Sequence, residues 1–146
     1  MPSFEYAVKV IAGRSNGEVA APGEYWTAVN VHNPGPRTVE FGQKLAVALP
    51  HRRPGPIRPF IPCVLRPDEA LEIDRQDILE QAEMGDFVKG FAVIIANAQL
   101  DVVAVYTAAP DERGVSTIEI ERVQPRLLRP VLRATRKTAA RRRSRR

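Results

Sequence analysis

The sequence has little of the chemistry that usually identifies an enzyme or a metalloprotein. It holds one cysteine and two histidines in 146 residues, so an intrachain disulfide is excluded. A tetrahedral zinc site would need Cys63, His32 and His51 to converge, and none of them has close ligand spacing. We therefore expect no metal and no other cofactor. Cys63 stands between Pro62 and Val64, an apolar setting typical of a buried thiol and not of a nucleophile.

Long apolar runs are also missing. No stretch approaches 18 consecutive apolar residues, and the N-terminus lacks a basic region followed by an apolar core and a small-residue cleavage site. We therefore expect no membrane span, no signal peptide and a cytoplasmic location. Thirteen prolines and nine glycines separate short apolar runs, which favours one domain of many short elements over a bundle of long helices.

Acidic residues gather between Asp68 and Asp77, but without the pattern of a catalytic or calcium site. The run lacks the spacing and the turn glycine of an EF-hand loop. Nothing in it predicts an enclosing pocket that would separate the pKa values of two carboxyl groups. No serine lies in a Gly-x-Ser-x-Gly motif, and the glycines form no phosphate-binding loop. The sequence thus predicts a non-enzymatic protein with no catalytic residues.

Seven short segments have the alternation or the β-branched content of strands. They are 4–11, 24–33, 38–49, 70–73, 91–95, 100–106 and 115–123. The stretch from Phe87 to Thr107 contains two of them, which we expect to be neighbouring antiparallel strands at the centre of the sheet. Asp74 is expected to cap a short helix that ends at Gly85. The pattern predicts a seven-stranded antiparallel immunoglobulin-like β-sandwich over residues 1–125, with a flattened barrel or jelly roll as the alternative.

Two features of this domain could bind a partner. Trp26 and Tyr25 point to opposite faces of one strand, so Trp26 is either a core residue or an exposed anchor for a protein or a sugar. Residues 50–67 contain six prolines, and the stretch from Arg53 to Pro59 fits a basic-x-x-Pro-x-x-Pro ligand pattern. The alternative for this stretch is a stiff connection at a sheet edge. Trp26, Arg53 and Arg58 are the candidate partner-binding residues.

The charge is divided unevenly between the domain and the C-terminus. Residues 1–125 carry 12 bases and 17 acids, for a net charge of −5, whereas residues 126–146 carry ten bases and no acid. Such a block repels itself and is expected to be disordered until it is neutralised. The candidate polyanion-binding residues are Arg133, Arg136, Lys137, Arg141, Arg142, Arg143, Arg145 and Arg146. The alternatives are a solubilising extension, or a tail that lies on the acidic body and is displaced by stronger polyanions.

Four segments of the predicted domain resemble a family of uncharacterised bacterial proteins. They read Tyr25-x-Thr-Ala-Val-Asn-Val-His-Asn-Pro34, Leu65-x-Pro-Asp-Glu-Ala-Leu-Glu-Ile-Asp74, Phe87-x-x-Gly-Phe-x-Val-Ile94 and Leu100-Asp-Val-Val-Ala-Val-Tyr106. The resemblance covers roughly residues 6 to 126. It implies an immunoglobulin-like β-sandwich of unassigned function. The resemblance therefore predicts a fold but identifies no functional residue in this chain.

Together these observations predict a structural or protein-interaction module with a basic tail that binds nucleic acid or another polyanion. The alternative is a sandwich that binds a carbohydrate or another small ligand, which would need a concave sheet face bearing aromatic side chains. The protein partner is not identified by the sequence. An unpaired edge strand would also permit self-association.

Overall fold

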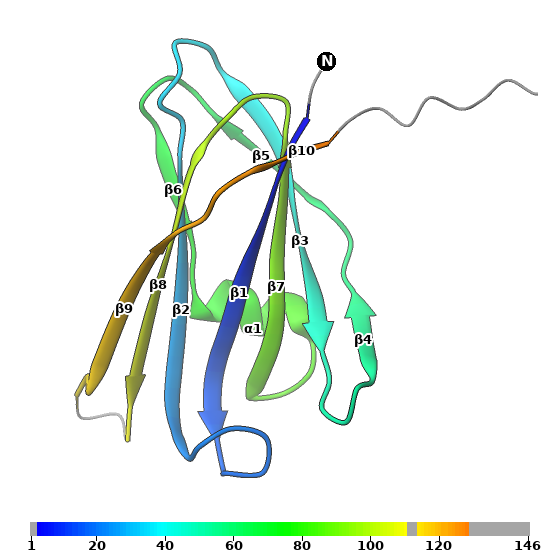
Figure 1. Cartoon of the computed structure of the whole chain (residues 1–146), viewed down its shortest axis with the longest axis vertical. Helices are drawn as coiled ribbons and strands as arrows, with labels where there is room; N and C mark the ends of the chain where they lie inside the picture. The colour runs from blue at the N-terminus through cyan, green and yellow to red at the C-terminus, as the bar shows by residue number, and fades with distance from the viewer. Residues whose placement is uncertain (1–2, 111–113, 129–146) are drawn as a thin grey trace, which may run out of the picture.

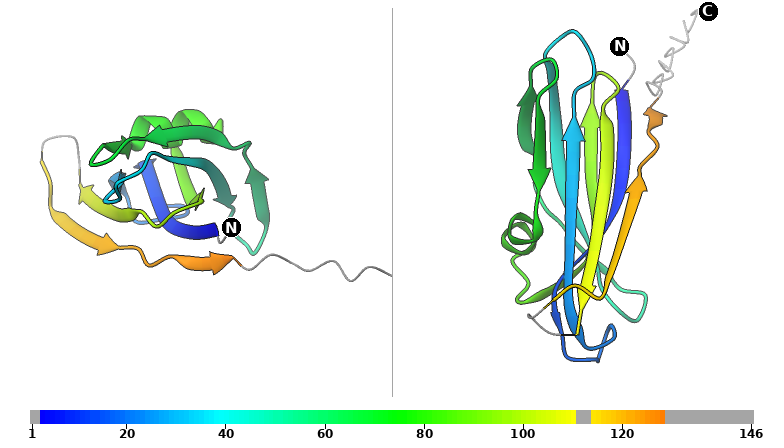
Figure 2. Two further views of the ribbon diagram at one scale, coloured as in Figure 1. Left: turned by 90° about the horizontal axis from the view of Figure 1, so that it is seen from above. Right: turned by 90° about the vertical axis from the view of Figure 1, so that its left-hand side faces the viewer.

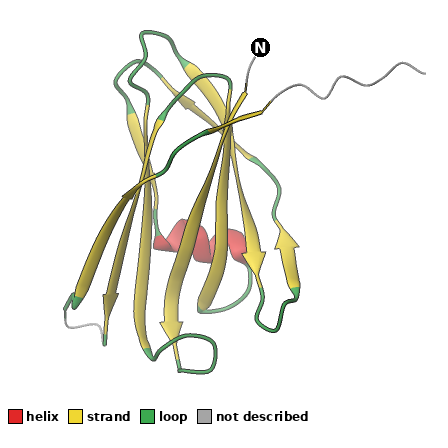
Figure 3. Cartoon of the chain, viewed as in Figure 1, coloured by secondary structure: helices red, strands yellow, loops and turns green. Residues whose placement is uncertain are grey.

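The computed structural model describes residues 3–110 and 114–128, which form ten strands and one short helix. The first strands are β1 (Ser3–Ser15), β2 (Gly23–His32), β3 (Val39–Ala48), β4 (Pro54–Ile57), β5 (Ile61–Leu65) and β6 (Ala70–Ile73). The helix α1 (Arg75–Ala82) precedes β7 (Phe87–Ala96), β8 (Asp101–Ala109), β9 (Thr117–Arg122) and β10 (Arg126–Leu128). The prediction of a mostly β chain with one short helix is confirmed (Figure 3).

The prediction of a seven-stranded immunoglobulin-like sandwich is wrong. All ten strands belong to one antiparallel sheet with the order β4-β3-β7-β1-β2-β8-β9, while β5, β6 and β10 pair with β3, β2 and β1. The three strands that were not predicted are β4, β5 and β10. Pro54, Pro56 and Pro62 lie in β4 and β5, at an edge of the sheet, where a residue without an amide hydrogen is tolerated. Figure 2 shows the sheet curling around the core, with α1 across one side.

The expected central hairpin is also wrong, because β7 and β8 do not pair with each other. β7 lies between β1 and β3, and β8 lies between β2 and β9. Both strands are central, as their apolar sequences require, but the turn between them crosses the core. Leu100, at the end of that turn, is buried. The hydroxyl of Tyr6 donates to the Leu100 carbonyl at 2.9 Å and accepts from its amide at 2.7 Å.

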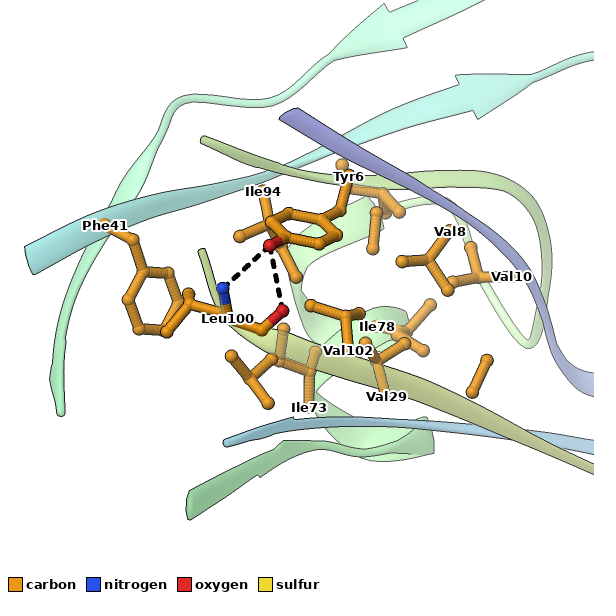
Figure 4. Close-up of a cluster of buried hydrophobic side chains, with 14 of the residues drawn as sticks. Tyr6, Val8, Val10, Val29, Phe41, Ile73, Ile78, Ile94, Leu100 and Val102 are labelled. Atoms are coloured by element: carbon orange, nitrogen blue, oxygen red, sulfur yellow. Dashed lines mark hydrogen bonds between the residues drawn. The ribbon is translucent and has the colours of Figure 1, made fainter. Parts of the chain in front are cut away.

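The core is filled by alternate residues of β1, β7, β3, β2 and β8. Tyr6 is the largest fully buried side chain, and it packs with Val8, Ile94 and Val102 (Figure 4). The helix contributes Ile78, which is also fully buried. These side chains alternate along the strands with outward-facing residues, as period-two geometry requires. The core therefore fixes which residues of each strand reach the outer surface.

One edge of β1 is closed mainly by side chains. Along this edge β1 pairs with β10 at Ser3–Glu5 and with β2 at Gly13–Ser15. Between these short pairings, the Thr27 hydroxyl accepts from the Ile11 amide at 2.9 Å and donates to its carbonyl at 2.7 Å. The Tyr106 hydroxyl donates to the Lys9 carbonyl at 2.8 Å. Two hydroxyl side chains thus form the hydrogen bonds to the β1 backbone that a neighbouring strand would otherwise form.

The helix begins where the sequence predicts it. Asp74 is the N-cap and accepts from the Asp77 amide, while the Asp77 carboxylate accepts from the Asp74 amide, which completes a capping box. The helix ends at Ala82, and Glu83 follows in a left-handed conformation with φ of 52°. The chain therefore turns two residues before the expected stop at Gly85.

At the other end of the sheet, β9 is an edge strand among the described residues. It pairs with β8 on one side, and all six of its residues are exposed. Ile118 and Ile120 point to one face and are 65% and 67% exposed, while Glu119 and Glu121 point to the other. From β9 the chain crosses to β10, which lies beside the start of β1 (Figure 1).

Replacing Tyr6 with Phe tests the tie between β1 and the turn at Leu100. The change leaves the buried amide and carbonyl of Leu100 without this partner, so we expect Tyr6→Phe to lower the free energy of unfolding by about 1–3 kcal/mol. Tyr25→Phe is the control, because its hydroxyl donates to the Ala21 carbonyl at an exposed site. Urea unfolding measures both, and equal losses would contradict a special role for Tyr6.

The ionisation of Tyr106 tests the second tie. Burial, followed by the nearby charge of Glu121, raises the pKa of Tyr106 to about 12. An unfolded tyrosine ionises near pH 10. The contribution of the protonated Tyr106 hydroxyl to folding stability is therefore fully present below pH 10 and is lost as the pH rises towards 12. We expect the tyrosinate absorbance titration of the protein, minus that of Tyr106→Phe, to have its midpoint near pH 12. A midpoint near pH 10 would show that the hydroxyl is not held in this way.

Candidate functional site

Outward-facing residues of β1, β7 and β3, together with Phe60 from the segment between β4 and β5, form a surface that combines lysines with exposed apolar groups. We call it the lysine–phenylalanine face. Its members are Lys9, Lys44, Phe60, Lys89, Phe91, Val93 and Ile95. The register places Lys9 beside Phe91 and Phe91 beside Ala46, while the next outward row holds Val93 and Lys44. The face lies opposite α1 and is turned towards the viewer in Figure 1.

Each of the two phenylalanines has a lysine over its ring. The Nζ atom of Lys9 lies 5.1 Å from the centre of the Phe91 ring, and that of Lys44 lies 4.6 Å from the centre of the Phe60 ring. The rings stay accessible, since Phe60 is 46% and Phe91 42% exposed. The Phe60 ring packs on β3 at Gly42, where the Cβ of any other residue would come within 2.9 Å of the ring. These contacts hold both rings at the surface.

The charge of this face is positive. Lys9, Lys44 and Lys89 are the only lysines of the described residues, and all three lie on it. Burial, helped by the charge of Lys89, lowers the pKa of Lys9. The acid Glu5 lies at the edge of the face, where it is ion-paired with Arg126 of β10. Glu40 is a further acid at its border. Glu119 and Glu121 of β9 line a hollow together with Lys9, at the β1 border of the face. An anion would therefore meet three lysines across the face and acids at its borders.

A hollow lies between α1 and β5, on the other side of the sheet from the lysine–phenylalanine face. It has a volume of about 500 Å³ and includes Gln43, Cys63 and Gln81 in its lining. The amide of Gln43 donates to Gln81 at 2.7 Å. Burial raises the pKa of the Cys63 thiol, which disfavours the thiolate that a nucleophile needs. Arg58, a candidate partner-binding residue, reaches this hollow and is ion-paired with Glu83.

Trp26 is half-buried, so it is neither the core residue nor the free anchor that were expected. The guanidinium carbon of Arg75 lies 5.0 Å from the centre of its ring. Arg75 in turn pairs with Glu24 at 2.9 Å, and Glu24, which is 3% exposed, also pairs with Arg14. Trp26 thus packs on an arginine that is ion-paired with the buried Glu24. Its neighbour Tyr25 packs edge-on against Phe87.

The remaining candidates are separate from one another. Arg53 is exposed in the turn before β4. The Nδ1 atom of His32 lies 3.2 Å from a carboxylate oxygen of Asp101. Within residues 3–110 and 114–128, no three His, Cys, Asp or Glu residues are arranged to hold a metal. In the same ranges no helix is long and apolar enough to cross a membrane. The predicted polyanion-binding residues from Arg133 onward lie outside the described residues.

The lysine–phenylalanine face was not predicted from the sequence. Its members are far apart in the chain and meet only because β7 pairs with both β1 and β3. One signal was available, because Lys9, Lys44 and Lys89 each occupy an outward position in an alternating strand. A single lysine in that position is ordinary, and only the strand order shows that the three gather on one surface.

Comparison with known proteins gives a likeness in fold. No family model and no curated protein matches the chain. The crystal structure of Thermotoga maritima 1070 is similar, with a TM-score of 0.52 and 10% sequence identity over 84% of this chain and 91% of that chain. At this level of identity the likeness concerns the path of the backbone and carries no activity or ligand.

The ion pairs of the buried Glu24 yield a stability prediction. Glu24→Gln removes the charge that Arg14 and Arg75 share, and a hydrogen bond to a charged group typically contributes about 1.5–3 kcal/mol. We expect a loss of this size in urea unfolding. The control is Glu69→Gln, which alters an exposed pair with Arg66 and should cost less than about 1 kcal/mol. Similar losses in the two variants would contradict the assignment.

Proposed function

We propose that this protein is a non-enzymatic interaction module that binds polyanions through its arginine-rich C-terminal tail. The observation that carries the proposal is the separation of charge, +10 in residues 126–146 against −5 in the rest. Arginine favours bidentate contacts with phosphate or sulfate groups. Release of counterions from the polyanion would drive binding without sequence preference.

The start of the tail supports this proposal. Arg126–Leu128 form β10, which pairs with Ser3–Glu5 at the edge of the lysine–phenylalanine face. The described chain therefore ends, at Leu128, at the edge of a surface that carries three lysines. A polyanion bound by the tail would be held next to that surface and away from the acidic residues of α1.

The state of the other candidate residues supports a non-enzymatic module. The Cys63 thiol has a raised pKa, and Trp26 and Arg58 are engaged by Arg75 and Glu83. Trp26 is thus occupied by an internal contact, which weakens the alternative of a sugar site built on it. The acid Asp74, together with Asp77, serves to cap α1.

The test replaces the eight predicted tail residues with Gln in the full chain. Each phosphate contact with a single strand contributes a slope of about −0.7 to the logarithmic salt dependence, so losing eight contacts should flatten the slope by about 6. Binding to heparin and to mixed DNA and RNA is measured across a salt series. The residues changed are Arg133, Arg136, Lys137, Arg141, Arg142, Arg143, Arg145 and Arg146.

The control keeps the charge by changing the seven arginines among these residues to Lys and leaving Lys137 in place. It should bind with a salt dependence close to that of the unmodified chain, because charge number sets the slope. Failure of the unmodified chain to bind any of the polyanions at low salt would overturn the proposal. Binding by the Gln variant equal to that of the unmodified chain would do the same.

A further inference from the structure

We infer that single-stranded nucleic acid binds across the lysine–phenylalanine face, with bases stacked on Phe60 and Phe91 and with phosphates beside Lys9 and Lys44. The inference rests on the proposed function for the contribution of the tail, and goes beyond it by assigning a second binding element to the folded domain. An exposed sheet that presents aromatic rings between cations has the chemistry for single-strand binding.

The spacing of the two rings fits separate bases. Phe60 lies over Gly42, and Phe91 is paired with Ala46, four residues further along the same strand. At about 3.3 Å per residue, the two positions are about 13 Å apart. Lys44 lies between them on β3. A strand of nucleic acid running along β3 could therefore place one base on each ring and a phosphate near the intervening ammonium group.

The surface between the rings suits the flat faces and sugars of nucleotides. Val93 and Ile95 of β7 fill the outward positions beside Lys44 and Gly42, and both are partly exposed. A shallow hollow of about 670 Å³ continues from this area over Phe60 and Val64 to Ser3. Because Ser3 is paired with Leu128, this hollow leads to the point where the tail begins. One strand could thus contact the face and the tail together.

Charge favours a nucleic acid over a second copy of the protein on this face. A two-fold dimer through the face would bring two sets of Lys9, Lys44 and Lys89 together, which is unfavourable. A single strand of DNA or RNA would instead supply negative charge to each lysine. It would also exchange the existing cation–π contacts of Lys9 and Lys44 for stacking of a base on each ring.

The experiment changes Phe60 and Phe91 together to Leu in the full chain and measures binding of a short oligothymidylate, an oligouridylate and heparin. Stacking is worth about 1–3 kcal/mol per base, so the double variant should bind both oligonucleotides at least tenfold more weakly. Heparin has no bases, and its binding should change less than twofold. The double variant with Tyr at both positions should recover oligonucleotide binding.

The control is Ile118→Ala with Ile120→Ala, which removes two apolar side chains of β9 that are more exposed than Phe60 and Phe91. It should leave all three affinities unchanged. Equal losses for heparin and the oligonucleotides in the Leu variant, or no loss, would overturn the inference while the proposed function stands. If the tail variant with eight Gln residues bound the oligonucleotides as tightly as the unmodified chain, and lost this binding when Phe60 and Phe91 became Leu, the inference would stand although the proposed function had failed.

Sedimentation provides a further decisive outcome. We expect the unmodified chain and the Leu variant to have the same oligomeric state. A dimer that dissociates when Phe60 and Phe91 become Leu would assign the face to a second copy of the chain and would overturn the inference.

Discussion

The structure depends on the way the backbone of β1 is satisfied along the edge that faces β2. Strand pairing covers only the two ends of this edge, and the hydroxyls of Thr27 and Tyr106 serve the backbone between them. These side chains let β2 diverge from β1 without leaving buried polar groups unpaired. The space so opened is filled by the core around Tyr6 and Ile78. The curl of the sheet is therefore secured by a few polar side chains as well as by apolar packing.

The same arrangement produces the outer surface. Because Tyr6, Val8 and Val10 point into the core, the intervening Lys9 must point outward. β7 then brings Phe91 beside it, and β3 adds Lys44 on the far side. Chain segments that are remote in sequence acquire a common chemistry only through this strand order. The domain and the cationic tail are linked by β10, which ties the end of the described chain to its beginning.

Local features could be predicted from the sequence, whereas long-range pairing could not. The capping pair Asp74 and Asp77 marked the start of α1, and alternation marked β2 correctly. The order of the strands was missed because Asn97-Ala98-Gln99 looks like a hairpin turn, although Tyr6, more than ninety residues away, holds the chain there across the core. The strands β4 and β5 were missed because they lie in the proline-rich stretch 50–67, and proline within a run argues against a strand. The lysine–phenylalanine face could not be found because it requires the strand order.

The sequence of β9 has a consequence for how copies of this protein meet. In an antiparallel pair of two β9 strands, any register that brings the isoleucines together on one face also gathers Glu119 and Glu121 of both copies on the other. A register shifted by one residue would instead set the glutamates against isoleucines or against Arg122. Two copies of β9 therefore cannot pair their isoleucines without also bringing their glutamates together, whereas a strand that carries basic residues in alternation could complement this edge.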